Sequence, residues 1–181
     1  GNGGTNGKDF VVLSLAPDET ERWCWMSDGP DHADDECFSV CYGGGYVYPA
    51  GYYTEGDKDI TIFKLSAATG VSQWRHSTYW SYDDVGYDIV YGGDGNLYIG
   101  GYSGGNGGAN GKDFVALSLA PDETERWVWM SDGAGHQDDE CFSICYGGGY
   151  VYPAGYQTWG DKDINVFKLS AATGTSQWRY E

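Results

Sequence analysis

The sequence predicts an all-β fold in which four-stranded antiparallel units repeat along the chain. Residues 1–77 align without a gap with residues 105–181, at an offset of 104 residues, and 63 of these 77 positions are identical. A shorter repeat lies inside this unit, because a Lys-Asp pair recurs from Lys8 onward in steps of 50, 54 and 50 residues. A period of about 50 residues is typical of propellers and other repeat arrays.

The composition favours short strands over helices. Aromatic residues make up 17% of the chain, and 30 of its 181 residues are glycine. Large rings suit the pleated surface of a sheet, and glycine suits the tight turns between strands.

One hairpin is predicted where apolar and polar residues alternate on both sides of a turn. It spans residues 9–15 and 21–25 around a turn that contains Pro17. In the next unit the same hairpin spans residues 59–65 and 71–75 around a Thr-Gly turn. Alternation of this kind indicates half-buried strands, and Pro and Gly each suit a turn.

A second hairpin precedes the first in each unit. It spans residues 37–42 and 46–52 around a glycine turn. Its counterpart spans residues 87–91 and 97–102 around the turn Gly-Gly-Asp-Gly-Asn, which is a strong hairpin signal.

Two hairpins per period predict a four-stranded β-propeller-type blade. Blade boundaries are expected near residues 27–36, 76–84 and 131–140 of a single array over residues 1–181. The chain opens with the second hairpin of a blade and then holds three blades, or about 3.5. Since propellers generally close with at least four blades, three outcomes are expected. Two chains complete a seven-bladed ring, further covalent sequence completes it, or the units stack openly.

The chain carries a family resemblance in its Thr-Gly turns. Residues 64–75 read K-L-S-A-A-T-G-V-S-Q-W-R, which resembles the tryptophan-docking repeat of PQQ-like, quinoprotein-type β-propellers, roughly A-L-D-x-x-T-G-x-x-x-W. Residues 168–179 match it equally well. Residues 83–102 are similar to SBBP-type β-propeller repeats, with an Asp-rich start and a D-G-N-x-Y-x-x-G hairpin. The resemblance covers essentially the whole chain and implies propeller blades, although the units with a Pro turn lack the Thr-Gly.

Four tryptophans occupy the docking position of these repeats, and we expect them to pack between blades. They are Trp23, Trp74, Trp127 and Trp178. The other four, Trp25, Trp80, Trp129 and Trp159, are less constrained. Exposed rings among them would stack on sugars, whereas buried rings would only fill the blade interior.

The charge of the chain restricts its partners. Its 27 acidic and 10 basic residues give a formal net charge of −17. This balance argues against nucleic acids and anionic membrane surfaces as partners. No run of 18 apolar residues is present, so no membrane insertion is predicted. We expect an extracellular or cell-surface protein, present here as a mature fragment or as part of a longer chain.

Two copies of the motif C-F-S-[V/I]-C raise the question of disulfides. They contain Cys37 with Cys41, and Cys141 with Cys145. Cysteines four residues apart on an extended strand lie roughly 13 Å apart, beyond the reach of a disulfide. A disulfide within each motif therefore requires a bulge or turn, and the alternative is a pair of buried thiols.

An acidic loop occurs twice and suggests a calcium site. It contains Asp28, Asp34 and Asp35 in the first copy, and Asp132, Asp138 and Asp139 in the second. Calcium binds several hard oxygen ligands, although this spacing is not that of an EF-hand. The alternative is that the aspartates cap turns and accept backbone hydrogen bonds between blades.

Three functions fit the sequence. The first is a non-enzymatic extracellular scaffold that assembles with itself, as a homo-oligomer or filament, or with missing blades of the same polypeptide. The second is a lectin-like propeller that binds glycans. The third rests on the resemblance and is a fragment of a PQQ-dependent dehydrogenase. No catalytic residue is predicted, because no polar cluster is unique to one unit.

Overall fold

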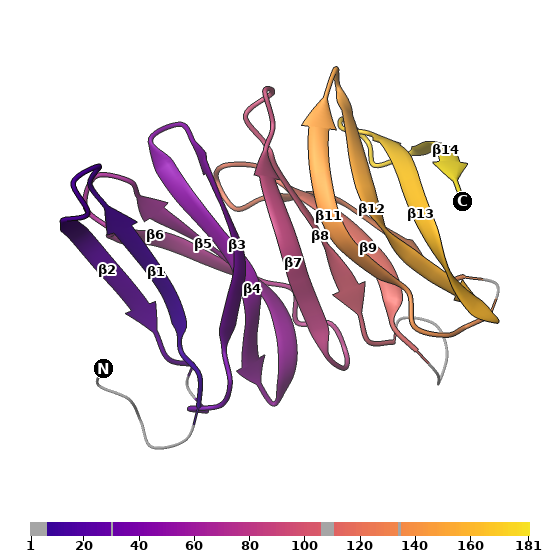
Figure 1. Cartoon of the computed structure of the whole chain (residues 1–181), viewed down its shortest axis with the longest axis horizontal. Coiled ribbons are helices and arrows are strands. Elements are labelled where there is room, and N and C mark those ends of the chain that lie inside the picture. Colours follow the sequence, from indigo (N-terminus) through magenta and orange to yellow (C-terminus); the bar gives the residue numbers. More distant parts are fainter. Residues whose placement is uncertain (1–6, 30, 106–110, 134) are drawn as a thin grey trace.

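The computed structural model describes residues 7–29, 31–105, 111–133 and 135–181, and these residues form strands without helices. The strands make four antiparallel sheets that follow one another along the longest axis of the molecule (Figure 1). Within the described residues no segment forms a helix able to cross a membrane.

Each sheet contains strands that are consecutive in the chain and paired in chain order. Sheet A contains β1 (Phe10–Leu15) and β2 (Glu21–Ser27). Sheet B contains β3 (Glu36–Gly43), β4 (Tyr46–Glu55), β5 (Asp57–Ser66) and β6 (Ser72–Ser77). Sheet C contains β7 (Asp84–Tyr91), β8 (Leu97–Ser103), β9 (Asp113–Leu119) and β10 (Glu125–Ser131). Sheet D contains β11 (Glu140–Gly147), β12 (Tyr150–Trp159), β13 (Asp161–Ser170) and β14 (Ser176–Tyr180).

The predicted hairpins form at the predicted places, and the all-β prediction of four-stranded antiparallel sheets is confirmed. The glycine turns between the first two strands of sheets B and C place Gly45 and Gly95 at φ 85° and 86°. Glycine adopts these angles without steric cost. The segments 28–35, 78–83 and 132–139 connect one sheet to the next.

A β-bulge interrupts the first strand of each four-stranded sheet. The register shifts between Cys37 and Ser39 in β3, and at the equivalent positions of β7 and β11. The facing residue of β4 is Gly51, where a Cβ atom would lie 1.8 Å from the carbonyl oxygen of Glu36. The bulge therefore requires glycine opposite it and turns the bulged residue away from the pleat.

The core consists of layers between neighbouring sheets. Phe10 and Val12 of sheet A pack against Tyr53, Phe63 and Leu65 of sheet B. The same type of layer joins sheets C and D. It contains Tyr98, Phe114, Ala116 and Trp127 of sheet C, with Cys141, Ile144, Val151, Phe167, Leu169 and Ala171 of sheet D.

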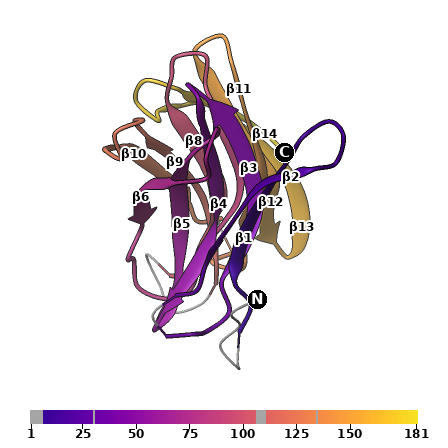
Figure 2. The same ribbon diagram turned by 90° about the vertical axis from the view of Figure 1, so that its left-hand side faces the viewer.

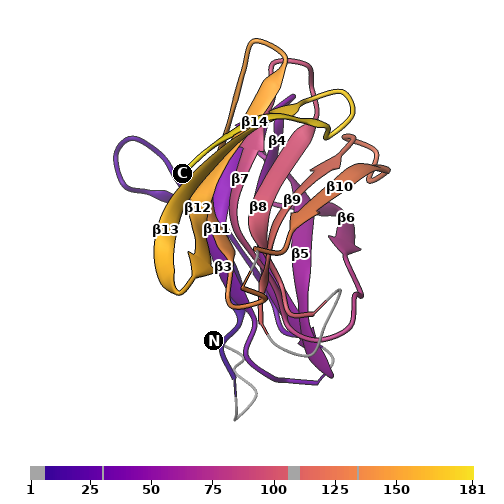
Figure 3. The same ribbon diagram turned by 90° about the vertical axis from the view of Figure 1, so that its right-hand side faces the viewer.

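A second type of layer joins sheets B and C. It contains Tyr48, Ala50, Ile60 and Ile62 of sheet B, with Ile89, Leu97, Ile99, Val115, Leu117 and Leu119 of sheet C. The two types alternate along the chain, so each end of the row presents one half of a B/C layer. Figures 2 and 3 show these ends, with β1 and β2 at one and β13 and β14 at the other.

Candidate association surfaces

The docking tryptophans join neighbouring sheets through their indole N–H groups. Trp23 donates to the carbonyl oxygen of Ala67 at 3.1 Å, and Trp127 donates to that of Ala171 at 3.0 Å. Trp74 donates to the carbonyl oxygen of Pro121 at 3.1 Å. Each acceptor is the same turn position of the following sheet, so these three residues make equivalent contacts between sheets.

The Thr-Gly turn has a physical reason in this contact. Gly70 adopts a φ of 71°, and a Cβ atom there would lie 2.8 Å from the ring of Trp23. Any other residue would be strained by the backbone angle and would push the ring away. The Pro121 turn receives Trp74 without such a glycine, and Lys64 adds a second donor to the Pro121 carbonyl oxygen at 2.9 Å.

Trp178 departs from the prediction. It is the copy of Trp74, yet it is 44% exposed and contacts Tyr152 of its own sheet rather than a following one. The position equivalent to Pro121 is Pro17, which lies in sheet A at the opposite end of the row. Docking at this position therefore needs a sheet that sheet D does not have beside it.

The Lys-Asp and Asp-Asp motifs are two halves of one contact between sheets. The backbone N–H of Lys8 donates to Asp34 at 2.9 Å, and the N–H of Asp35 donates back to the Lys8 carbonyl oxygen at 2.8 Å. Lys58 and Lys112 repeat the first bond, to Asp83 at 3.1 Å and to Asp138 at 3.2 Å. Lys162 is the fourth copy, and it lies exposed over the ring of Tyr156 of its own sheet, at 3.8 Å.

The remaining aspartates of the acidic loops serve their own connections. Asp35 accepts the N–H groups of Gly29 at 2.6 Å and Thr54 at 2.9 Å. Burial raises its pKa, and these two hydrogen bonds act against that rise. Asp139 is held in the same way by Gly133 and Thr158.

The calcium hypothesis for the acidic loops stays a prediction, and the hydrogen bonds of these carboxylates can be compared with it. Asp28 and Asp132 each bond the ring of a histidine four residues later, His32 and His136. Among the described residues no group of three or more His, Cys, Asp or Glu side chains is arranged to hold a metal ion. The contacts seen for the acidic-loop carboxylates are hydrogen bonds within the connections and to the neighbouring strands.

All five cysteines lie as free thiols in the structure. The bulge between Cys37 and Ser39 reverses the side-chain alternation within the motif. As a result Cys37 packs in the A/B layer, whereas Cys41 packs on the opposite face in the B/C layer. Burial raises the pKa of Cys37 to about 11 and that of Cys41 to about 12.

The bulges also align aromatic side chains along the first strands of the three sheets. The ring of Tyr87 lies 5.4 Å from that of Phe38 and 5.4 Å from that of Phe142. Phe38 and Phe142 are 44% and 52% exposed.

Of the less constrained tryptophans, Trp25 and Trp129 pack in the core and Trp80 is half-buried, whereas Trp159 is 75% exposed.

Sequence reasoning missed the role of Asp88, which connects the first strands of sheets B, C and D. It accepts the hydroxyl groups of Ser39 at 2.8 Å and Ser143 at 3.0 Å, and the backbone N–H of Ile144 at 2.9 Å. The signal was present, since this position is Ser in sheets B and D and Asp only in sheet C.

Two buried carboxyl groups, one on β5 of sheet B and one at the start of β7 of sheet C, each have an oxygen without a hydrogen-bond partner among the described residues. These oxygens are Asp59 Oδ1 and Asp84 Oδ2. Burial, together with nearby acidic side chains, raises the pKa of each group to about 6. Both groups are therefore a cost to the folded state when they ionise.

The end formed by sheet A, here named the head, exposes apolar residues that are core residues elsewhere. Val11, Leu13 and Leu15 of β1 are 43%, 52% and 51% exposed, whereas their copies in β9 are fully buried. On β3, Val40 is 54% exposed and its copy Ile144 only 4%. The head thus spans the open face of β1 and the adjoining face of β3.

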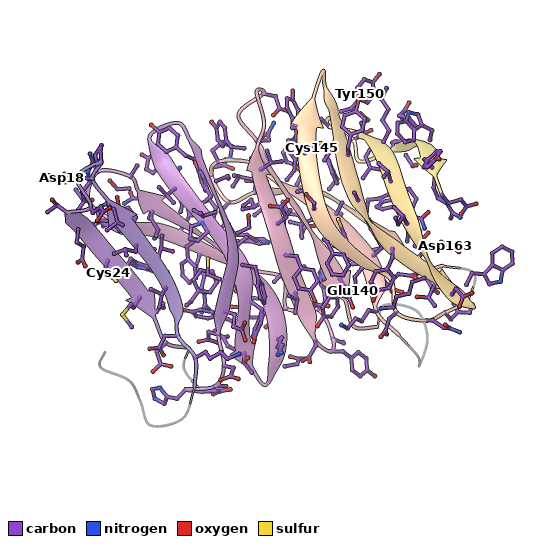
Figure 4. All side chains as sticks on the ribbon, viewed as in Figure 1. Asp18, Cys24, Glu140, Cys145, Tyr150 and Asp163 are labelled. Atoms are coloured by element: carbon purple, nitrogen blue, oxygen red, sulfur yellow. The ribbon has the colours of Figure 1, made fainter. Side chains whose placement is uncertain are left out.

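The end formed by sheet D, here named the tail, exposes the sheet face that in sheet B packs against sheet C. Ile164 is 75% exposed, whereas its copy Ile60 is fully buried. Cys145 is exposed and Tyr150 half-buried on the same sheet, and Figure 4 labels both on sheet D, with Asp163 at the far end of the row. Ile164, Cys145, Tyr150 and Trp178 thus form an apolar face, because their copies in sheet B all belong to the B/C layer, and no described segment covers it.

Comparison with known proteins finds no family model that matches this chain and no curated protein similar to it in sequence. The geometry of the two end surfaces is therefore the basis for inferring what the protein does.

Proposed function

We propose that this chain is a non-enzymatic structural module, a β-propeller-type repeat array that assembles through its two open ends. The observation that carries the proposal is that near-identical residues are buried inside the row and exposed at its ends. Fully burying a Val or Leu side chain is worth roughly 1.5–3 kcal/mol. Exposed apolar faces of this kind mark interaction surfaces.

The recurrent polar motifs support a structural role. Three of the four Lys-Asp pairs and three of the four docking tryptophans are engaged in contacts between sheets. Contacts repeated from sheet to sheet suit a scaffold, in which every unit holds the next. They also support the resemblance to PQQ-like and SBBP-type propeller repeats.

We place the protein outside the cell, at the cell surface or beyond it. The net charge of −17 supports this placement, because it keeps a protein with exposed apolar ends soluble. The free cysteines add no support for it, since the disulfides that would have favoured an oxidising compartment are not formed.

Sedimentation over a wide concentration range tests the association. The wild-type chain is expected to gain mass with concentration, and the substitutions Leu13→Asp at the head and Ile164→Asp at the tail are expected to reduce this gain strongly. Val71→Asp is the matched control, because Val71 is 59% exposed in a turn and its copy is the polar Thr175. A wild-type chain that stays monomeric at every concentration would overturn the proposal.

A second candidate function is glycan binding by the aromatic row of the first strands. Phe38, Tyr87 and Phe142 present rings on which the faces of sugars stack. Binding to a broad glycan panel, lost in Phe142→Ala, would favour this candidate. The absence of binding across the panel would remove it.

A further inference from the structure

We infer that the head of this chain is an acceptor for a β-hairpin with the sequence pattern of residues 83–103. This inference deepens the proposed association and rests on it, because it names the partner that the open ends fit. Its basis is a comparison of sheet A with sheet C, whose β9–β10 hairpin is the copy of β1–β2.

The free edge of β1 is the first support. In sheet C, β9 pairs with β8 on one side and β10 on the other, whereas among the described residues β1 pairs only with β2. The register of β8 on β9 places Ile99 opposite Leu117 and Leu97 opposite Leu119. The same register on β1 would place these hairpin residues opposite Leu13 and Leu15. An unpaired strand edge is a template for an added strand.

The open face of β3 is the second support. Its copy in sheet D, β11, packs against β8, where Cys141 and Ile144 lie over Gly100. Tyr146 of β11 stacks on Tyr98 of β8, with ring centroids 5.5 Å apart. In β3 the corresponding residues are Cys37, Val40 and Tyr42, and Tyr42 is 68% exposed. A hairpin beside β1 would cover all three.

The close approach at Gly100 makes the fit selective. A Cβ atom at Gly100 would lie 2.6 Å from the sulfur atom of Cys141. The equivalent sulfur at the head is that of Cys37. A hairpin with a branched side chain in place of this glycine would therefore not seat on β3.

Within the chain, sheet B packs against one face of the four-stranded sheet C. A head completed by such a hairpin would be four-stranded too and would present the same kind of face. That face matches the tail of a second copy, where Trp178 and Lys168 correspond to the two donors to Pro121. Without the hairpin, each of two joined copies contributes a sheet A of only two strands. Neither copy has a spare hairpin of the β7–β8 type to place beside β1. Joining two chains therefore does not complete a blade.

A synthetic peptide with the sequence of residues 78–104 tests the inference against the full chain. Titration with a labelled peptide at a chain concentration below self-association is expected to show saturable binding. Val40→Asp, at a position exposed in the free chain, is expected to weaken binding at least tenfold. Val71→Asp is expected to leave it unchanged, and the Gly100→Val peptide is expected not to bind.

Hydrogen exchange gives a second readout, because the β1 amides should become protected when the peptide binds. No binding, binding by the Gly100→Val peptide, or equal binding by the Val40→Asp chain would each overturn the inference. Self-association measured without peptide tests the proposed function separately. Association without peptide binding would contradict only the hairpin acceptor.

Discussion

Strands β1 and β9 are near-identical in sequence and opposite in environment. Val11, Leu13 and Leu15 face outward at the head, whereas Val115, Leu117 and Leu119 are fully buried between sheets B and C. The difference arises from the β7–β8 hairpin and sheet B, which cover β9 and have no counterpart beside β1 in the part of the chain that the structure describes. Burial of a repeat residue is therefore a property of its neighbours, and each end of the row carries surface that a neighbour would cover.

The largest expected effect comes from truncating the same leucine in both environments. Leu117→Ala is expected to cost about 2–5 kcal/mol of unfolding free energy, because it leaves a cavity in a closed layer. Leu13→Ala is expected to cost less than about 1 kcal/mol, because Leu13 is half-exposed. Urea denaturation of dilute protein checks both values. Equal costs would mean that β1 is covered in solution.

A smaller effect, on the pH dependence of stability, is expected when Asp59 and its copy Asp163 are compared. Asp59 is buried and Asp163 is exposed. The pKa of Asp59 is raised from 3.8 to about 6, chiefly by burial. The folded chain therefore binds more protons than the unfolded chain between about pH 4 and pH 6. Stability falls as the pH rises through this window, by on the order of 1–2 kcal/mol for this group.

Asp59→Asn is expected to flatten this pH dependence, and the part that remains would come from the other buried carboxyl groups with a raised pKa, which are Asp84, Asp35 and Asp139. Asp163→Asn is expected to leave the dependence as it is in the wild type. Urea midpoints measured at pH 4.5 and pH 7 supply the comparison. An unchanged slope in Asp59→Asn would show that this carboxyl group is solvated in the folded chain.

The docking tryptophans provide a third comparison. Trp74→Phe removes the indole donor to Pro121 and is expected to cost about 1 kcal/mol, because Lys64 still bonds the same oxygen. Trp178→Phe is expected to have almost no effect in dilute solution. A cost for Trp178→Phe that grows with protein concentration would indicate that this residue docks on a second copy.

The smallest effect, a difference in labelling rate, maps the two ends separately. Cys37 at the head is half-buried and its copy Cys141 is buried, whereas at the tail Cys145 is exposed and its copy Cys41 is half-buried. A thiol reagent is expected to modify Cys145 and the exposed Cys24 first and Cys141 last. Mass spectrometry of partly labelled protein gives the order. Protection of Cys145 at high concentration alone would locate self-association at the tail.

Local patterns were sufficient to predict the strands and their turns. Alternating residues around Pro17 and around the Thr-Gly turns mark hairpins that form at those places. The docking of Trp23, Trp74 and Trp127 also followed from the repeat. These features depend on contacts between residues close in sequence, or on a position that every unit repeats.

Other features could not be predicted because they depend on register and on neighbours. The Lys-Asp and Asp-Asp motifs were both visible, but their hydrogen bonds join residues about 25 positions apart, across the connection from one sheet to the next. A single bulged residue places Cys37 and Cys41 on opposite faces, which spacing alone does not reveal. Asp88 became recognisable only when three first strands were seen to lie side by side.

The sequence by itself determined the strands, the turns and the four-stranded repeat, because backbone preference and apolar alternation act over a few residues. Only the tertiary structure decided which copies of a repeated side chain are core and which are surface. The physical reason is that a side chain is buried only where the surface of a neighbouring sheet covers it. The sequence of one repeat specifies its own surface and not that of the neighbour. Leu13 and Leu117 have nearly the same local sequence, and only the neighbouring strands separate an exposed apolar end from a closed layer.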